Sequence, residues 1–135
     1  MDRIEDTHLS FHVYIDINDG ELDNFMKCVE NMLKQVQNEP NTLYYNFSFN
    51  HDKTKAYVRE GYKNGQAMIY HLTTAAEKVK AFAPFCKFTK VECRGTKEDW
   101  EVAKGHAEPM GAEFWEIAKG GTFNRNVAIS KIHFG

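Results

Sequence analysis

The amino-acid sequence predicts an α+β domain in which a split βαβ unit forms an antiparallel sheet with helices on one face. Segments of alternating apolar and polar residues indicate strands, and segments with apolar residues at helical spacing indicate helices. The expected order is strand, helix, strand, strand, helix, strand, with a further helix and strand. No linker divides the chain, so we expect one domain over residues 1–135, with a core over about 9–93 and a C-terminal extension over about 94–135.

The first two elements follow directly from the spacing of apolar residues. They occupy every second position from 9 to 17, which predicts a half-buried strand. From 22 to 36 they recur every three or four positions, which predicts an amphipathic helix. Asn18 with Glu21 resembles a capping box at the start of this helix, and Pro40 lies beyond its end.

The next strands are expected to form a hairpin. Residues 42–50 and 54–62 both show strand patterns, and the turn His51-Asp52-Lys53 separates them. Thr74 with Glu77 predicts a second capping box, and Thr96 with Asp99 predicts a third helix start. The remaining expected elements are helices over 66–71 and 75–83, a fourth strand over 85–93, a short helix after residue 96, a fifth strand from residue 112, and a weak alternation over 126–134.

Aromatic residues are expected on both faces of this sheet. Helices cover only one face, yet Tyr14, Tyr44 and Tyr57 fall on the opposite parity from the apolar positions of their strands. A second copy of the sheet would bury them, so we predict a symmetric homodimer. The alternative is that these amphipathic side chains face water.

Composition excludes several classes of partner. The net charge is −2 and no basic cluster is present, which argues against nucleic acid and anionic membranes. No apolar run approaches the length of a membrane span, and the first residues lack a signal-peptide pattern, so a cytoplasmic protein is expected. Cys28, Cys86 and Cys93 form no CxxC pair, and the scattered histidines predict no metal site.

Three stretches in order carry a family resemblance: FHVYIDINDGELDNFMKCVENM, NEPNTLYYNFSF and YVREGYKNGQAMIYHL. Glu39-Pro40-Asn41 stands where the family usually has Glu-Pro-Gly, and Glu60, Tyr62 and His71 match its Glu-x-aromatic and helical histidine. Over residues 9–93 the sequence resembles the antibiotic biosynthesis monooxygenase-like (ABM) family. That resemblance implies a ferredoxin-like fold that pairs into a dimeric α+β barrel.

The resemblance implies several activities. Family members include monooxygenases that act on phenolic or quinol-like substrates without a cofactor, and others degrade haem. The haem-degrading members use an Asn, a Trp and a His, but here Tyr62 replaces the Trp. Many members also carry a polar or histidine position after the helical histidine, where this chain has Thr73 and Thr74.

Cofactor-free oxygenation requires a base, groups that orient the substrate and a dry pocket. His71 is the expected base, because imidazole titrates near neutral pH and a helix end favours its charged form. Alternatively it caps helix carbonyls or faces solvent, and Glu60 pairs with Arg59 or with a lysine of the partner subunit. The other expected site residues are Glu60 and Tyr62 beside the base, and Tyr14, His12, Tyr45 and Phe47 in substrate binding.

The sequence therefore predicts a cofactor-independent, metal-free monooxygenase that acts on a small aromatic, quinol or polyketide-like molecule. The alternative is a non-catalytic dimer of the same fold that binds a small molecule or is purely structural. Fold alone does not decide between them.

Overall fold

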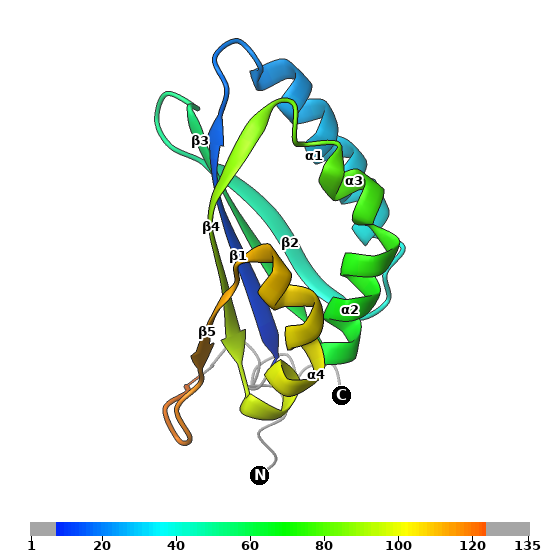
Figure 1. Ribbon diagram of the computed structural model, residues 1–135, viewed down its shortest axis with the longest axis vertical. Helices are drawn as coiled ribbons and strands as arrows, with labels where there is room; N and C mark the ends of the chain where they lie inside the picture. Colours follow the sequence, from blue (N-terminus) through cyan, green and yellow to red (C-terminus); the bar gives the residue numbers. More distant parts are fainter. Residues whose placement is uncertain (1–7, 124–135) are drawn as a thin grey trace.

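The computed structural model describes residues 8–123 and contains one five-stranded sheet in the order β2-β3-β1-β4-β5. Neighbouring strands are antiparallel except β4 and β5, which are parallel. Figure 1 shows α1, α2 and α3 on the same side of this sheet, which confirms the predicted α+β class. The elements are β1 (Leu9–Ile17), α1 (Leu22–Val36), β2 (Thr42–Phe49), β3 (Lys55–Tyr62), α2 (Gly65–Thr74), α3 (Ala76–Lys80), β4 (Cys86–Gly95), α4 (Lys97–Ala107), the 3₁₀ turn η2 (Glu108–Met110) and β5 (Glu113–Glu116).

The predicted limits agree with the structure best at the start of the chain. The first strand and first helix have the expected bounds, and the hairpin strands differ from them by one residue at one end. The helix expected over 66–71 is longer, and the one expected over 75–83 is shorter. The alternating segment at 126–134 lies outside the described residues.

One of the three predicted helix caps is confirmed. The Thr96 side chain accepts a hydrogen bond from the backbone N–H of Asp99 at 3.1 Å. The cap expected at Asn18 is wrong, because its amide donates to the carbonyl of Pro84 instead. The cap expected at Thr74 is also wrong, since its hydroxyl donates to the carbonyl of Tyr70 within α2.

The core lies between the helices and one face of the sheet, which we call the inner face. In β1 this face presents Leu9, Phe11, Val13 and Ile15, all buried. The register places residues of β3 and β4 on both sides of them, for example Glu60 opposite Phe11. Burial of these apolar side chains is the main stabilising contribution to the fold.

The other face of the sheet, the outer face, carries polar residues and the three predicted tyrosines. Each tyrosine has a polar partner: Tyr14 donates to Glu92 at 3.1 Å, and the hydroxyls of Tyr44 and Tyr57 lie 2.9 and 2.6 Å from His8 Nε2 and His12 Nδ1. The predicted homodimer would cover this face, and it stays a prediction.

The C-terminal extension adds a helix and a strand to the core, as expected. The helix α4 packs against α2, and the ring of Trp100 stacks on Phe114 of β5 with centroids 4.8 Å apart. The contact with α2 is close at Gly65, where a Cβ atom would lie 2.6 Å from the carbonyl oxygen of Asp99. The Gly65 N–H also donates to the Asp99 carboxylate at 3.1 Å. Within residues 8–123, no helix is long and apolar enough to cross a membrane.

Candidate functional site

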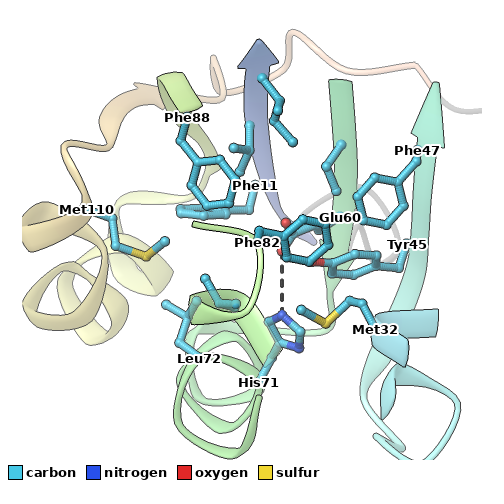
Figure 2. Close-up of a pocket in the computed structure, with 14 residues that line it drawn as sticks. Phe11, Met32, Tyr45, Phe47, Glu60, His71, Leu72, Phe82, Phe88 and Met110 are labelled. Carbon is cyan, nitrogen blue, oxygen red and sulfur yellow. Dashed lines mark ion pairs between the residues drawn. The ribbon is translucent and has the colours of Figure 1, made fainter. Parts of the chain in front are cut away.

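A pocket lies between the inner face of the sheet and the helices (Figure 2). Its cavity volume is only about 30 Å³. The pocket is therefore narrow, and its ionisable side chains are those of His71, Glu60 and Tyr45. Its lining residues are Phe11, Val13, Ile15, Met32, Tyr45, Phe47, Val58, Glu60, His71, Leu72, Val79, Phe82, Phe88 and Met110.

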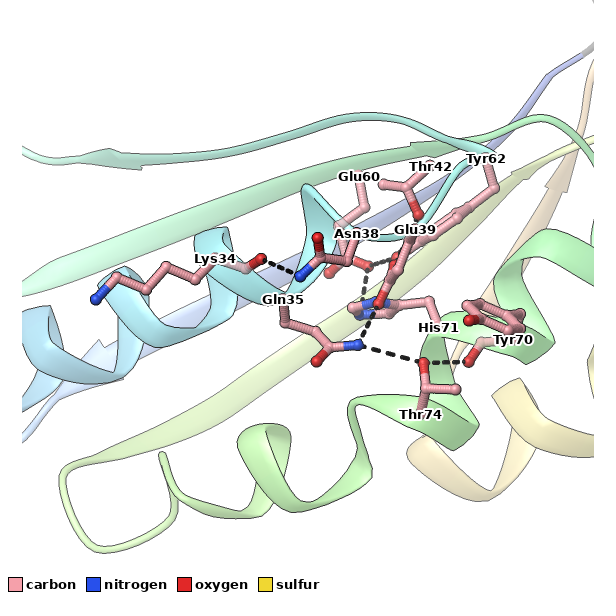
Figure 3. A network of polar contacts seen from close by, with 10 residues as sticks. All are labelled: Lys34, Gln35, Asn38, Glu39, Thr42, Glu60, Tyr62, Tyr70, His71 and Thr74. Atoms are coloured by element: carbon pink, nitrogen blue, oxygen red, sulfur yellow. Dashed lines mark hydrogen bonds and ion pairs between the residues drawn. The ribbon is translucent and has the colours of Figure 1, made fainter.

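His71 reaches this pocket from the last turn of α2. That helix begins at a strong cap, because the Asn64 side chain accepts a hydrogen bond from the Ala67 N–H at 2.9 Å. The His71 side chain is 1% exposed, so it neither faces solvent nor caps the helix end. Its Nδ1 lies 2.8 and 3.0 Å from the two carboxylate oxygens of Glu39 (Figure 3). The imidazole is thus held in one orientation.

Glu39 follows α1 and is buried in spite of its charge. Its oxygens also accept hydrogen bonds from Thr42 at 2.8 Å and from Gln35 at 3.1 Å. Burial would raise the pKa of Glu39, but the bonds and charge of His71, with the bonds from Thr42 and Gln35, lower it. Glu39 is therefore a carboxylate, and a carboxylate accepts the proton of His71 Nδ1. The lone pair of a neutral His71 is then on Nε2.

The other ring nitrogen of His71 points at the second carboxyl group of the site. Glu60 Oε1 lies 4.0 Å from His71 Nε2 (Figure 2). Burial raises the pKa of Glu60, although the charge of His71 and hydrogen bonds from Tyr62 and Tyr45 act in the opposite direction. The Tyr62 hydroxyl donates to Glu60 Oε1 at 2.5 Å. Burial raises the pKa of both tyrosines well above the usual value, so both remain neutral donors.

The separation between His71 Nε2 and Glu60 Oε1 suits a single bridging oxygen atom. At 4.0 Å the two atoms are too far apart for a mutual hydrogen bond. An oxygen about 2.8 Å from each would be within hydrogen-bond distance of both. Glu60, whose pKa is raised, then faces His71, which the Glu39 carboxylate holds in place. This is the arrangement of a general acid and a general base.

Several solved structures share the fold of this chain. No family model and no curated protein matches the sequence. The crystal structure of MupZ from Pseudomonas fluorescens is 26% identical and superposes with a TM-score of 0.81. The match covers 89% of this chain and 96% of MupZ.

Two further similar structures are named as monooxygenases. A candidate antibiotic biosynthesis monooxygenase from Nitrosomonas europaea has a TM-score of 0.61 at 18% identity, covering 68% of this chain and 92% of its own. A candidate monooxygenase from Lactobacillus acidophilus has a TM-score of 0.59 at 20% identity, covering 64% of this chain and 43% of its own. The chain has the ABM fold. Identities this low carry the fold alone.

This ABM fold brings most of the predicted site residues together. His71, Glu60 and Tyr62 form one buried cluster, and Tyr45 and Phe47 line the pocket. The alternative pairing of Glu60 with Arg59 is not found, because that guanidinium lies over the Tyr44 ring on the outer face.

Two predicted substrate-binding residues lie on the other side of the sheet. His12 and Tyr14 alternate with the pocket-lining residues of β1, so they point to the outer face. Their partners there are Ser10, Tyr57 and Glu92. The expectation that His12 and Tyr14 share a pocket with His71 is therefore wrong, because successive residues of a strand point to opposite faces of the sheet.

Glu39 is the site residue that the sequence analysis missed. In the sequence it appears only in the Glu39-Pro40-Asn41 motif, and no neighbouring residue indicates a buried carboxylate. The available signal was its place in the motif that precedes the second strand. Met110, which closes one side of the pocket, was also missed because it lies beyond the region of resemblance. Among residues 8–123, no three His, Cys, Asp or Glu side chains are grouped as metal ligands.

Proposed function

We propose that this protein is a cofactor-independent monooxygenase for a compact, mostly apolar molecule with an acidic hydroxyl or enolisable carbonyl group. The observation that carries the proposal is the buried Glu39–His71 pair, with Nε2 of His71 facing Glu60 across 4.0 Å at an otherwise apolar pocket. The fold that it shares with structures named as monooxygenases supports the reaction class.

His71 would act as general base in the first step. Its Nε2 takes the proton of the substrate hydroxyl, and Glu39 stabilises the imidazolium that results, as a carboxylate does for the histidine of a catalytic triad. Tyr62 and Tyr45 hold Glu60 by hydrogen bonds, and Glu60 orients the substrate oxygen. The apolar lining keeps water from the substrate anion.

Oxygen would then react with the electron-rich anion. For an activated methylene group such as that of an anthrone, the overall change is CH₂ plus O₂ to C=O plus H₂O. The substrate supplies the four electrons that reduce O₂, one oxygen atom remains on carbon, and the other leaves as water with both methylene hydrogens. The enzyme's part is proton transfer and shielding, so the balance requires no further reductant.

Oxygen consumption by the metal-stripped protein tests the proposal. A panel of anthrones and quinols is offered to the wild type, to His71→Ala, and to His51→Ala as a control at an exposed histidine. We expect roughly a 100-fold or greater loss of kcat for His71→Ala and no change for the control. Equal rates for wild type and His71→Ala would contradict the role of His71.

A reaction without oxygen is the second candidate, and the raised pKa of Glu60 favours it. A protonated carboxyl group facing a base can return to one substrate atom the proton removed from another, with no net redox change. Anaerobic exchange of the α-protons of 2-tetralone in D₂O, followed by NMR, detects such proton transfer. Exchange by the wild type but not by His71→Ala, with no oxygen consumed on the first panel, would favour this reaction. No exchange and no oxygen consumption would leave the non-catalytic binding alternative.

We also propose that the protein is a homodimer through the outer face. The concentration of tyrosines and of buried polar groups such as His12 and Glu92 on that face supports the proposal. Light scattering during gel filtration should give twice the 15.6 kDa mass of one chain. A single-chain mass at micromolar concentration would contradict it.

A further inference from the structure

One wall of the pocket comes from outside the four-stranded core. Met110 lies in η2, at the end of the extension helix α4, and lines the pocket with Leu72 and Phe88. Figure 2 shows Met110 and Phe88 on one side of the pocket and Tyr45 and Phe47 on the other. The pocket therefore runs across the sheet, and its β4 side ends at a residue of the extension.

The pocket is too narrow for an aromatic ring unless a side chain moves. The cavity volume of about 30 Å³ is far below the roughly 150 Å³ of a cavity that binds benzene. Most of the lining consists of rigid aromatic or branched side chains packed on strands and helices. Met32 is flexible but fully buried, whereas Met110 is only partly buried. A thioether chain with three rotatable bonds adapts readily to a ligand.

The similar structures differ in whether they extend beyond the core to the segment that contains Met110. The matches to the Nitrosomonas and Lactobacillus proteins cover 64–68% of the chain, which residues 9–93 can nearly account for. The match to MupZ covers 89% and cannot be confined to those residues. The extension is therefore an addition to the minimal fold that MupZ shares at least in part.

We propose that Met110 is the specificity-determining residue of this site and sets how many fused rings a ligand can have. The inference rests on the proposed ligand pocket. A phenolic hydroxyl between His71 and Glu60 leaves the rest of the ligand to extend along the sheet, and Met110 limits it on the β4 side. One ring stays short of Met110 and requires only a small shift of the other lining side chains, whereas a second and third ring require the Met110 side chain to move.

Binding of phenols of increasing size tests this role without requiring turnover. Dissociation constants for phenol, 1-naphthol and 2-anthrol are measured by calorimetry for wild type, Met110→Ala and Met110→Phe. Met26→Ala, at an exposed methionine of α1 outside the pocket, is the matched control. Circular dichroism and Tm confirm that each variant is folded, and a chemical-shift change at His71 locates the bound phenol.

We expect Met110→Ala to bind 2-anthrol roughly tenfold more tightly relative to phenol, because the removed side chain leaves room for another ring. Met110→Phe should weaken 2-anthrol by a similar factor and leave phenol unchanged. If phenol binds at His71 but the preference for size is the same in both Met110 variants and in Met26→Ala, the role of Met110 is wrong while the pocket stands. If none of the three phenols perturbs His71 in the wild type, both proposals are wrong.

Discussion

Among residues 8–123, one buried histidine lies on each side of the sheet, His71 in α2 and His12 in β1, and the two differ in their partners. His71 on the inner side bonds a carboxylate through Nδ1, and among the described residues Nε2 has no hydrogen bond and faces the pocket. His12 on the outer face has hydroxyl groups at both nitrogens, Ser10 at 2.8 Å and Tyr57 at 2.6 Å. One histidine is open to a ligand on one side, and the other is fully engaged.

The surroundings of His12 favour its neutral form. Burial, followed by the charge of Arg94, lowers the pKa of His12 to about 4, although Glu92 acts in the opposite direction. His12 is therefore neutral at physiological pH and a weak base. His71 differs in having the Glu39 carboxylate at Nδ1. Burial alone therefore does not distinguish the two histidines. The carboxylate at Nδ1 and the Nε2 that faces the pocket are what support the proposed role of His71 as a base.

Removal of Glu39 should have the largest effect on stability. Glu39→Ala leaves the donors of His71, Thr42 and Gln35 without their acceptor inside the protein. We expect a loss of about 3 kcal/mol in the free energy of unfolding, measured with urea. Glu39→Gln keeps an acceptor and should lose about half as much. A loss under about 0.5 kcal/mol for Glu39→Ala would show that the Glu39–His71 pair does not stabilise the fold.

Tyr62→Phe should have the next largest effect, because it removes one donor to buried Glu60. The expected loss of stability is about 1–2 kcal/mol. The pKa of Glu60 should rise further, since a hydrogen bond that favours the carboxylate is lost. Tyr70→Phe, at an exposed tyrosine of the same region, is the control. The pKa of Glu60 is measured by NMR of its carboxyl carbon during a pH titration. A pKa that is lower in Tyr62→Phe than in the wild type would contradict this role of Tyr62.

An outer-face substitution should cost less than either. Glu92 pairs with Arg94 at 3.1 Å and Lys90 at 3.3 Å, and both cations are about half exposed. Glu92→Gln should therefore lose at most about 1 kcal/mol, and the loss should shrink in 1 M salt. A loss of stability for Glu92→Gln that is independent of salt and as large as that for Glu39→Ala would contradict the expected difference in stability contribution between the two faces.

The pH dependence of stability should report the lowered pKa of His12. Below pH 6.5 the unfolded chain protonates His12, but the folded chain does so only near pH 4. Stability should therefore fall as the pH drops from 6.5 to about 4. His12→Gln should reduce the proton uptake on unfolding in this range by about one, and His51→Gln should not. Equal slopes for wild type and His12→Gln would contradict the lowered pKa.

The sequence predicted the elements well where periodicity alone decides them, as in β1 and α1. It failed for caps whose side chains had a competing partner. Asn18 and Thr74 have the right chemistry, yet each bonds a carbonyl group that the local pattern does not identify. Thr96 had no such competitor and capped as predicted.

The site was predictable where strand parity and a motif agreed. Alternation placed Glu60 and Tyr62 together, but the same rule also placed Tyr14 and His12 away from them once the inner side of β1 was known. Glu39 is 32 residues from His71 in the chain, and nothing local indicates that its carboxylate turns inward. Such a pairing depends on how α1 and α2 pack.

The close contact at Gly65 has a consequence for any attempt to shorten this protein. The first turn of the helix that carries His71 rests directly on the backbone of α4, with no space for even a methyl group between them. Trimming the chain after Gly95 to mimic the smaller relatives would leave that turn without its support. We therefore expect the helix that carries His71 and the appended segment to lose their structure together in a minimised version.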